Sequence, residues 1–218
     1  PIYLMDFGVF GRFYLALATW VSAPSDEAGE VASQAFALAE QLGQPHSLGF
    51  AMLANMIVAC MRDDDRTALP WAERCVAFAR DMGFPEFVAM GLVIRGWART
   101  RQGDPAAGLA DMSDGMAQWQ ATGFGNWQTW FTHLQVQALW ALRRFDGALA
   151  LVQQQLQRVA RTGEAQFQSL LMADQARLMA ALGADSTEVD AQWQAARDLA
   201  QRQGARAWVQ RIERLRSG

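Results

Sequence analysis

The chain has 218 residues, a net charge of -3 and a hydrophobic content of 51%. This length and apolar content indicate a folded chain with a large core and argue against disorder. The slight acidic excess disfavours a general nucleic-acid-binding protein, which would carry a basic stripe. No run of about 18 uncharged apolar residues occurs, so the sequence predicts no membrane span.

The first helical pair is expected over residues 6–43. Residues 6–22 carry apolar side chains at helical spacing, and a second helix with the same property runs to Leu42. Between them, Pro24 cannot continue a helix, and Ser25 is a suitable N-cap for the next one. This pair is the first structural unit.

Five glycines recur along the chain, each directly after a stretch with helical periodicity. They are Gly43, Gly83, Gly123, Gly163 and Gly204, spaced 40, 40, 40 and 41 residues apart. A glycine in this place can adopt the left-handed conformation that ends a helix. Apolar positions recur with the same period, as at Leu69, Leu109, Leu149 and Val189. Such a period predicts stacked helical repeats.

Four further units repeat the plan of helix, polar turn and helix. They cover residues 44–83, 84–123, 124–163 and 164–204. A last helix follows, with Val209, Ile212 and Leu215 as its apolar stripe, and residues 205–218 are expected to cap the array. The sequence therefore predicts eleven helices, no sheet and a single repeat domain over residues 1–218.

The helix–turn–helix plan resembles the tetratricopeptide repeat (TPR). The segment Arg95–Ala98 followed by Gln102–Pro105 carries this resemblance most clearly, because Gly96 lets the second helix approach and Gly103 opens the turn. The usual period is about 34 residues, whereas the longer period found here is typical of large bacterial signal-transduction ATPases. The resemblance implies an all-α fold, a right-handed α-solenoid of about five TPR-like repeats plus a C-terminal capping helix.

Two segments are similar to the C-terminal repeat region of bacterial regulators that carry an AAA-type ATPase module. Gly43–Ala51 (GQPHSLGFA) resembles a recurring GHPFSLAFA stretch of that group, and Gly91–Ala98 (GLVIRGWA) resembles its next unit. The likeness covers residues 8–205, with Arg99 in place of the usual apolar residue. Such regulators often begin with a class III adenylate or guanylate cyclase domain or a winged-helix DNA-binding domain.

This chain itself carries no cyclase or DNA-binding signature and no phosphate-binding loop of the GxxxxGK(S/T) kind. The resemblance therefore implies a non-enzymatic fragment of a larger regulator. Any ATPase or cyclase activity of the parent protein would lie outside it.

The TPR register predicts which side chains line a concave groove for a ligand or partner. They are Met90, Val93, Trp97, Trp130, His133, Gln137, Trp140 and Arg177. Tryptophan offers a large contact area and arginine offers fork-shaped donors, so both suit recognition. The alternative is that the aromatic residues form the core between helices, because a shift of one position in the register exchanges groove for core.

Other candidate sites favour structural interpretations. The acidic run Asp63–Asp65 falls on a repeat turn and is interpreted as solvated. His46 and His133 have no Asp or Cys partner near in sequence that would complete a catalytic triad. Cys60 and Cys75 lie in apolar helical stretches and are predicted to be buried free thiols, which fits a reducing cytoplasm. The sequence predicts no catalytic residue, no metal site and no cofactor.

The predicted function is recognition: a partner- or ligand-sensing scaffold in a bacterial signalling protein. Its partner would be a protein, a peptide or a neighbouring domain of the same chain, with self-association through the face of Pro1–Trp20. Two alternatives remain open. One is a small-molecule receptor that binds its effector between Trp130 and Trp140. The other is an all-α enzyme, which the lack of paired carboxylates facing one cavity disfavours.

Overall fold

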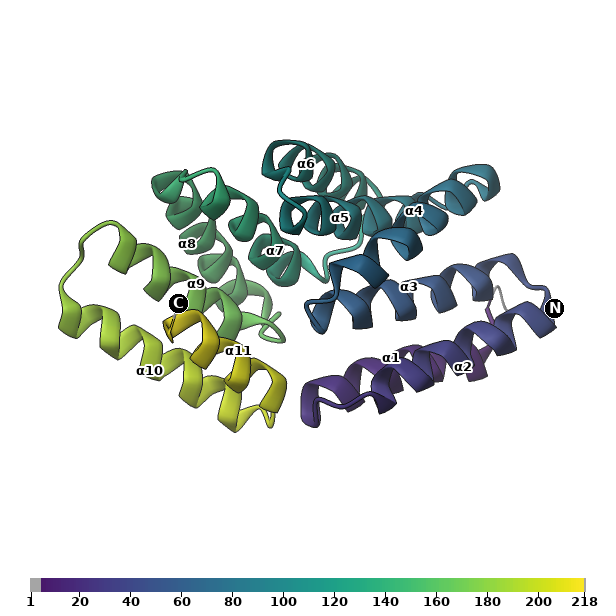
Figure 1. Cartoon of the computed structure of the whole chain (residues 1–218), viewed down its shortest axis with the longest axis horizontal. Helices are drawn as coiled ribbons and strands as arrows, with labels where there is room; N and C mark the ends of the chain where they lie inside the picture. Colours follow the sequence, from purple (N-terminus) through teal and green to yellow (C-terminus); the bar gives the residue numbers. More distant parts are fainter. Residues whose placement is uncertain (1–4, 218) are drawn as a thin grey trace. The chain divides into compact units, whose positions relative to one another are not determined.

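The computed structural model describes residues 5–217, which form eleven α-helices and no β-strand (Figure 1). The helices are α1 (Phe7–Ser22), α2 (Glu27–Leu42), α3 (Pro45–Met61), α4 (Asp65–Met82), α5 (Pro85–Arg101), α6 (Pro105–Ala121), α7 (Gln128–Ala141), α8 (Phe145–Thr162), α9 (Gln168–Ala181), α10 (Ser186–Arg202) and α11 (Arg206–Ser217). The expected all-helical fold is confirmed.

The helices fall into two compact units. The first ends at Phe124 and contains α1 to α6, and the second begins at Gly125 and contains α7 to α11. The boundary lies one residue beyond the predicted join between the third and fourth repeats. The assignment of all five repeats to a single domain stays a prediction.

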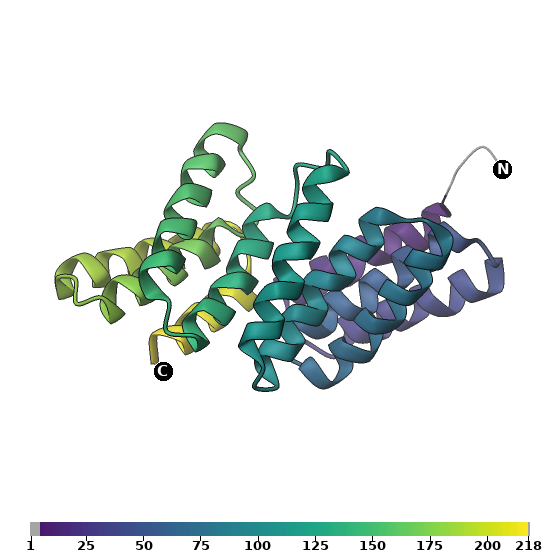
Figure 2. The same ribbon diagram turned by 90° about the horizontal axis from the view of Figure 1, so that it is seen from above.

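Each unit is built from two layers of helices. In the first unit, α1, α3 and α5 pack in succession, and α2, α4 and α6 pack against them (Figures 1 and 2). In the second unit, α7, α9 and α11 form the corresponding layer, and α8 and α10 pack on it. We call the odd-numbered helices A helices and the even-numbered ones B helices. The helix α11 packs on both α9 and α10, as the A helix of a further repeat would.

The periodic glycines mark the ends of the B helices. All five adopt left-handed φ values between 62° and 81°. A second series of left-handed residues, which sequence reasoning missed, lies in the turn between the A and B helices of four repeats. It comprises Asp63 (φ 61°), Gly103 (97°), Arg143 (55°) and Gly183 (79°). The second series has the same 40-residue period, but half of its members are not glycine, so no glycine pattern reveals it.

Close approach of α5 and α6 depends on facing glycines. A Cβ atom added to Gly96 would lie 2.5 Å from the carbonyl oxygen of Gly108, and one added to Gly108 would meet the carbonyl oxygen of Gly96. A Cβ atom on Gly115 would lie 2.6 Å from the carbonyl oxygen of Ala89. Since these neighbours are backbone atoms, no side chain fits at these positions. Gly96 therefore lets the B helix approach, as the sequence predicts.

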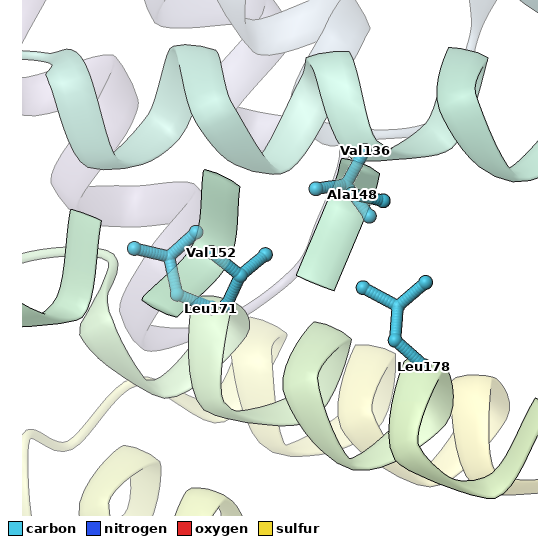
Figure 3. Packing of buried hydrophobic residues seen from close by; sticks show 5 residues of the cluster. All are labelled: Val136, Ala148, Val152, Leu171 and Leu178. Carbon is cyan, nitrogen blue, oxygen red and sulfur yellow. The ribbon is translucent and has the colours of Figure 1, made fainter. Parts of the chain in front are cut away.

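The core of the second unit joins three helices. Figure 3 shows its members, which are Val136 from α7, Ala148 and Val152 from α8, and Leu171 and Leu178 from α9. Trp140 and Phe145 are partly buried and pack against this cluster. Their two rings lie 4.9 Å apart between centroids. This packing places Trp140 at the edge of the core, where one part of its indole ring remains accessible.

Candidate functional site

The predicted groove residues separate into buried and partly exposed members. Met90, Val93, Trp97, Trp130 and His133 are buried, whereas Gln137, Trp140 and Arg177 are partly exposed. The first three belong to the core of the first unit, where a Cβ atom on Gly115 of α6 would lie 2.9 Å from Val93. The buried members pack between helices, as in the alternative in which these residues form the core and do not line a groove.

Trp130 is held in an aromatic cluster of the second unit. Its ring stacks on Phe167, the residue just before α9, at 5.9 Å between centroids, and Phe167 in turn lies 5.8 Å from the ring of Trp208 in α11. The ring of Trp127 lies 5.4 Å from that of Trp130 and 5.7 Å from that of Phe167. The cluster joins the three A helices of the second unit. Sequence reasoning identified Trp130 but missed the other three rings. Phe167 and Trp208 approach it only through the stacking of repeats, whereas Trp127 precedes it by three residues.

A buried polar pair connects α7 to α9. His133 donates from Nδ1 to Asp174 Oδ2 over 2.7 Å, and the two residues are 1% and 2% exposed. The amide nitrogen of Gln137 lies 3.4 Å from His133 Nε2. A ring nitrogen that is not protonated can accept from this amide nitrogen, while the other ring nitrogen donates to Asp174. Both ring nitrogens thus have partners, as buried polar groups require.

Asp174 was missed at the level of sequence because it lies 41 residues from His133. A partly exposed histidine–carboxylate pair at nearly the same separation occurs in the first unit, where His46 Nε2 lies 3.2 Å from Glu86 Oε1, 40 residues away. Neither histidine has a carboxylate partner near in sequence, but each has one a single repeat further on. The repeat period was the signal that could have found both pairs.

Arg177 lies one turn after Asp174 in α9 and covers Trp140. Its guanidinium carbon is 3.7 Å from the centroid of the indole ring, which is a close cation–π contact. Burial lowers the pKa of Arg177, and the nearby Asp174 carboxylate opposes that shift. The guanidinium stays charged at neutral pH, because an arginine pKa starts far above that range.

The guanidinium of Arg177 donates no hydrogen bond to any residue between 5 and 217, although it is partly buried. Its described interactions are the ring of Trp140 and the charge of Asp174. A guanidinium carries five N–H donors in a fixed plane. Arg177, Trp140 and Gln137 therefore form a partly exposed surface, supported from inside by His133 and Asp174. We call these five residues the α7–α9 site.

The described residues offer little for other chemistry. No group of three or more His, Cys, Asp or Glu side chains within residues 5–217 could hold a metal ion. Cys60 and Cys75 are buried and not in a disulfide. Burial raises the pKa of the Cys75 thiol to about 12, so it stays protonated at neutral pH. None of the helices in this part of the chain is both long and apolar enough to cross a bilayer.

Solved structures share this arrangement of helices. Two crystal structures of a putative kinesin light chain from Podosopora anserina with nearly identical TPR-like repeats superpose on the chain, each at 17% sequence identity. One has a TM-score of 0.58 and covers 88% of this chain and 93% of its own; the other has a TM-score of 0.54 and covers 94% of each. The chain has a TPR-like repeat fold.

The chain is also similar in sequence to a longer bacterial protein. The chain is 23% identical over 206 residues to an uncharacterized protein of Rhizobium meliloti (strain 1021), and the match covers 94% of the chain. It spans only 20% of the length of that relative. No protein-family model matches the TPR-like chain.

Proposed function

We propose that the chain is a non-enzymatic scaffold that binds a protein or peptide partner through the α7–α9 site. Helical-repeat folds present extended binding surfaces built from successive repeats, and the A helices α7 and α9 supply such a surface here. Trp140 and Arg177 are its contact residues, and these two residue types dominate the binding energy of many interfaces. Gln137 contributes a polar contact beside them, while His133 and Asp174 hold the two helices in register.

The observation that carries this proposal is the state of Arg177. Its guanidinium is partly buried on Trp140 and has no hydrogen-bond acceptor among the described residues. A carboxylate of a partner would accept two parallel N–H bonds from it. The favoured partner therefore presents an Asp, a Glu or a chain-terminal carboxylate, followed by an apolar group that packs beside Trp140.

Selection of binding peptides tests this assignment. The immobilised chain is used to select from a displayed peptide library, and enriched peptides are titrated by calorimetry. Enrichment of acidic peptides is expected, with affinity lowered about tenfold or more by Arg177→Ala. Arg161→Ala is the matched control, because Arg161 is an exposed arginine of the same unit in α8. Enriched peptides that bind equally well to the Arg177→Ala variant would refute the proposal.

The same experiments separate the alternatives. A small-molecule receptor would change its tryptophan fluorescence with metabolites and not with peptides. An all-α enzyme would turn over a substrate in the isolated chain, and that result would replace the scaffold assignment. The second-unit core already encloses Trp130, so an effector held between Trp130 and Trp140 would have to displace packed aromatic rings.

We also infer that the chain is a cytoplasmic region of a larger bacterial signalling regulator. The AAA-type ATPase regulators that its repeats resemble, and the much greater length of its Rhizobium relative, support this context. Binding at the α7–α9 site would then be passed to an ATPase, cyclase or DNA-binding domain of the same protein. A phosphate-binding loop in the parent sequence, with ATPase activity that responds to the selected peptide, is the expected result. A parent protein without such a domain would contradict it.

Self-association through α1 belongs to the same proposal. Phe7, Tyr14 and Leu15 are the large exposed apolar residues of this helix. They fall at spacings of seven and eight residues and so share one face. A second copy of the chain is the proposed occupant.

A further inference from the structure

A cleft in the first unit lies between two consecutive B helices. The backbones of α2 and α4 do not approach one another, because both pack on the A helix α3. The space between them has a volume of about 640 Å³ and is lined by residues of all three helices. This cleft lies in the first unit and shares no residue with the α7–α9 site.

The floor of the cleft carries a fixed hydrogen-bond acceptor. Asn55 of α3 is only 9% exposed, and its amide nitrogen donates to the carbonyl oxygens of Ala32 and Ala51, each over 2.9 Å. Both amide hydrogens are thus used, and the orientation of the amide is set. Its Oδ1 atom has no partner among residues 5–217. Because Asn55 lines the cleft, this oxygen is open to a donor from a ligand.

The lining of the cleft carries excess negative charge. Its carboxylates are Asp26, Glu30 and Asp64, and its only cation is Arg62. Arg62 is already paired with Asp26. Glu30 has no side-chain partner among the described residues. Asp64 accepts a hydrogen bond from the backbone nitrogen of Thr67 over 3.1 Å, and hydrogen bonding to Thr67 holds its pKa below the ordinary value. The charge of Arg62 also lowers the pKa of Asp64, so one guanidinium faces three carboxylates and Glu30 has no cationic partner of its own in the described part of the chain.

An aromatic side chain lines the same cleft. Trp71 of α4 is partly buried and makes an edge-to-face contact of 4.8 Å with Phe36 of α2. Arg74 lies 5.4 Å from the centroid of Trp71 and holds the ring further in place. A fixed indole beside carboxylates suits a ligand that has both methylene groups and a positive charge.

We propose that this cleft binds an alkylammonium group, either a lysine side chain of a partner or a free polyamine. An ammonium has three donors, and Asn55 Oδ1 together with the carboxylates of Glu30 and Asp64 provides three acceptors. The methylene groups of the ligand pack beside Trp71. The proposal does not depend on the α7–α9 site, whose partner carries the opposite charge.

Calorimetric titration of the chain with two probes tests the assignment. The probes are spermidine and a capped Gly-Lys-Gly peptide, with the same peptide acetylated on its lysine as the uncharged control. Binding of at least one charged probe is expected, and acetylation should abolish peptide binding. Binding of spermidine alone identifies a polyamine site, binding of the peptide alone identifies a lysine site, and either result supports the proposal. Absence of binding by both charged probes at millimolar concentration would overturn it.

Two variants connect binding to the cleft. Glu30→Gln should lower the affinity for the charged probe about fivefold, which is the effect expected for a partly exposed ion pair. Glu27→Gln is its matched control, because Glu27 lies in the same first turn of α2 and does not line the cleft. Trp71→Leu should also weaken binding, and its thermal melt reports whether it folds. Equal affinities of the Glu30→Gln and Glu27→Gln variants would show binding to general surface charge and refute the site.

Discussion

His133 and Asp174 hydrogen-bond over 2.7 Å although 41 residues separate them. The pair His46 and Glu86 repeats this relationship at 40 residues and 3.2 Å. In a stack of repeats, a side chain on one A helix meets its equivalent on the next, so residues one period apart become neighbours. In these two pairs, the separation of the partners along the chain equals the spacing of the periodic glycines.

Removing the carboxylate of Asp174 is expected to destabilise the second unit strongly. Asp174→Ala leaves a buried imidazole without its partner, and the expected loss in the free energy of unfolding is about 2–4 kcal/mol. Urea denaturation of the variant measures it. His133→Ala and the double variant complete a mutant cycle, in which a coupling energy of more than about 1 kcal/mol is expected. Strict additivity of the two single losses would show that the pair contributes no stability of its own.

The helix boundaries and the repeat could be predicted because their signals are local. Glycine after a helix, proline within a turn and the recurrence of apolar residues all lie within short stretches of sequence. The exposure of the groove residues could not be predicted in the same way. The helix α3 buries 13 of its 17 residues, and a helix that is apolar on all sides gives no periodic signal for its buried face. Trp97 and Trp130 on the similarly buried α5 and α7 share this ambiguity.

The cleft and the α7–α9 site depend on contacts between residues that lie far apart in the sequence, and no local pattern predicts such contacts. Asn55 is oriented by the backbone carbonyl oxygen of Ala32, 23 residues earlier. Arg177 acquires its role only when Trp140 is placed beneath it. The sequence did nominate Arg177, Trp140 and Gln137 together, because the repeat register aligned their positions. It missed Asp174, whose partner lies one repeat away.

Gly96→Ala is expected to destabilise the first unit by about 2–4 kcal/mol, because the new Cβ atom would overlap the backbone of α6. Chemical denaturation with tryptophan fluorescence measures the change. Gly147→Ala is the control, since a Cβ atom there would meet nothing within 4 Å. That control should be neutral or stabilising by up to about 1 kcal/mol, because alanine is the better helix former. If both substitutions changed the free energy of unfolding equally, the missing side chain at Gly96 would not be what allows α5 and α6 to approach.

Asp64 should make the stability of the first unit depend on pH. Hydrogen bonding to Thr67 lowers its pKa from the ordinary value of 3.8, so folding favours the carboxylate. Its stabilisation is present above the unfolded value and is lost as the pH falls through the folded value. Asp64→Ala removes this N-cap and should cost about 1 kcal/mol at pH 7. The difference from the unmodified chain should shrink towards pH 3, which thermal melts at both pH values measure.

The control for Asp64 is Asp81→Ala, because Asp81 is exposed near the opposite end of the same helix and caps nothing. It should not lower stability at pH 7. A difference between the Asp64→Ala variant and the unmodified chain that stays constant from pH 7 to pH 3 would contradict the role of the ionised carboxylate.

Arg143→Gly is expected to stabilise the second unit by about 1 kcal/mol. Arg143 holds a left-handed φ of 55° in the turn where two other repeats have glycine, and this conformation costs a residue with a side chain about 1–2 kcal/mol. Loss of the cation–π contact with Phe145, 5.5 Å away, reduces the gain. The reverse change, Gly103→Ala, should destabilise the first unit by about 1 kcal/mol or more. Denaturation curves measure the stability of both variants. If both were more stable than the unmodified chain, or both less stable, the cost of a side chain at these left-handed positions would be contradicted.

Self-association is expected to depend on the exposed face of α1. Phe7 and Leu15 are 62% and 54% exposed, and burying them against a second copy would remove apolar surface from water. The double variant Phe7→Ser with Leu15→Ser should therefore lower the apparent mass at high protein concentration, measured by light scattering after size-exclusion chromatography. Leu182→Ser is the control, because Leu182 is an exposed leucine at the end of α9. A concentration-dependent mass that is unchanged in the double variant would place the association elsewhere, and a constant monomer mass for the unmodified chain would refute it.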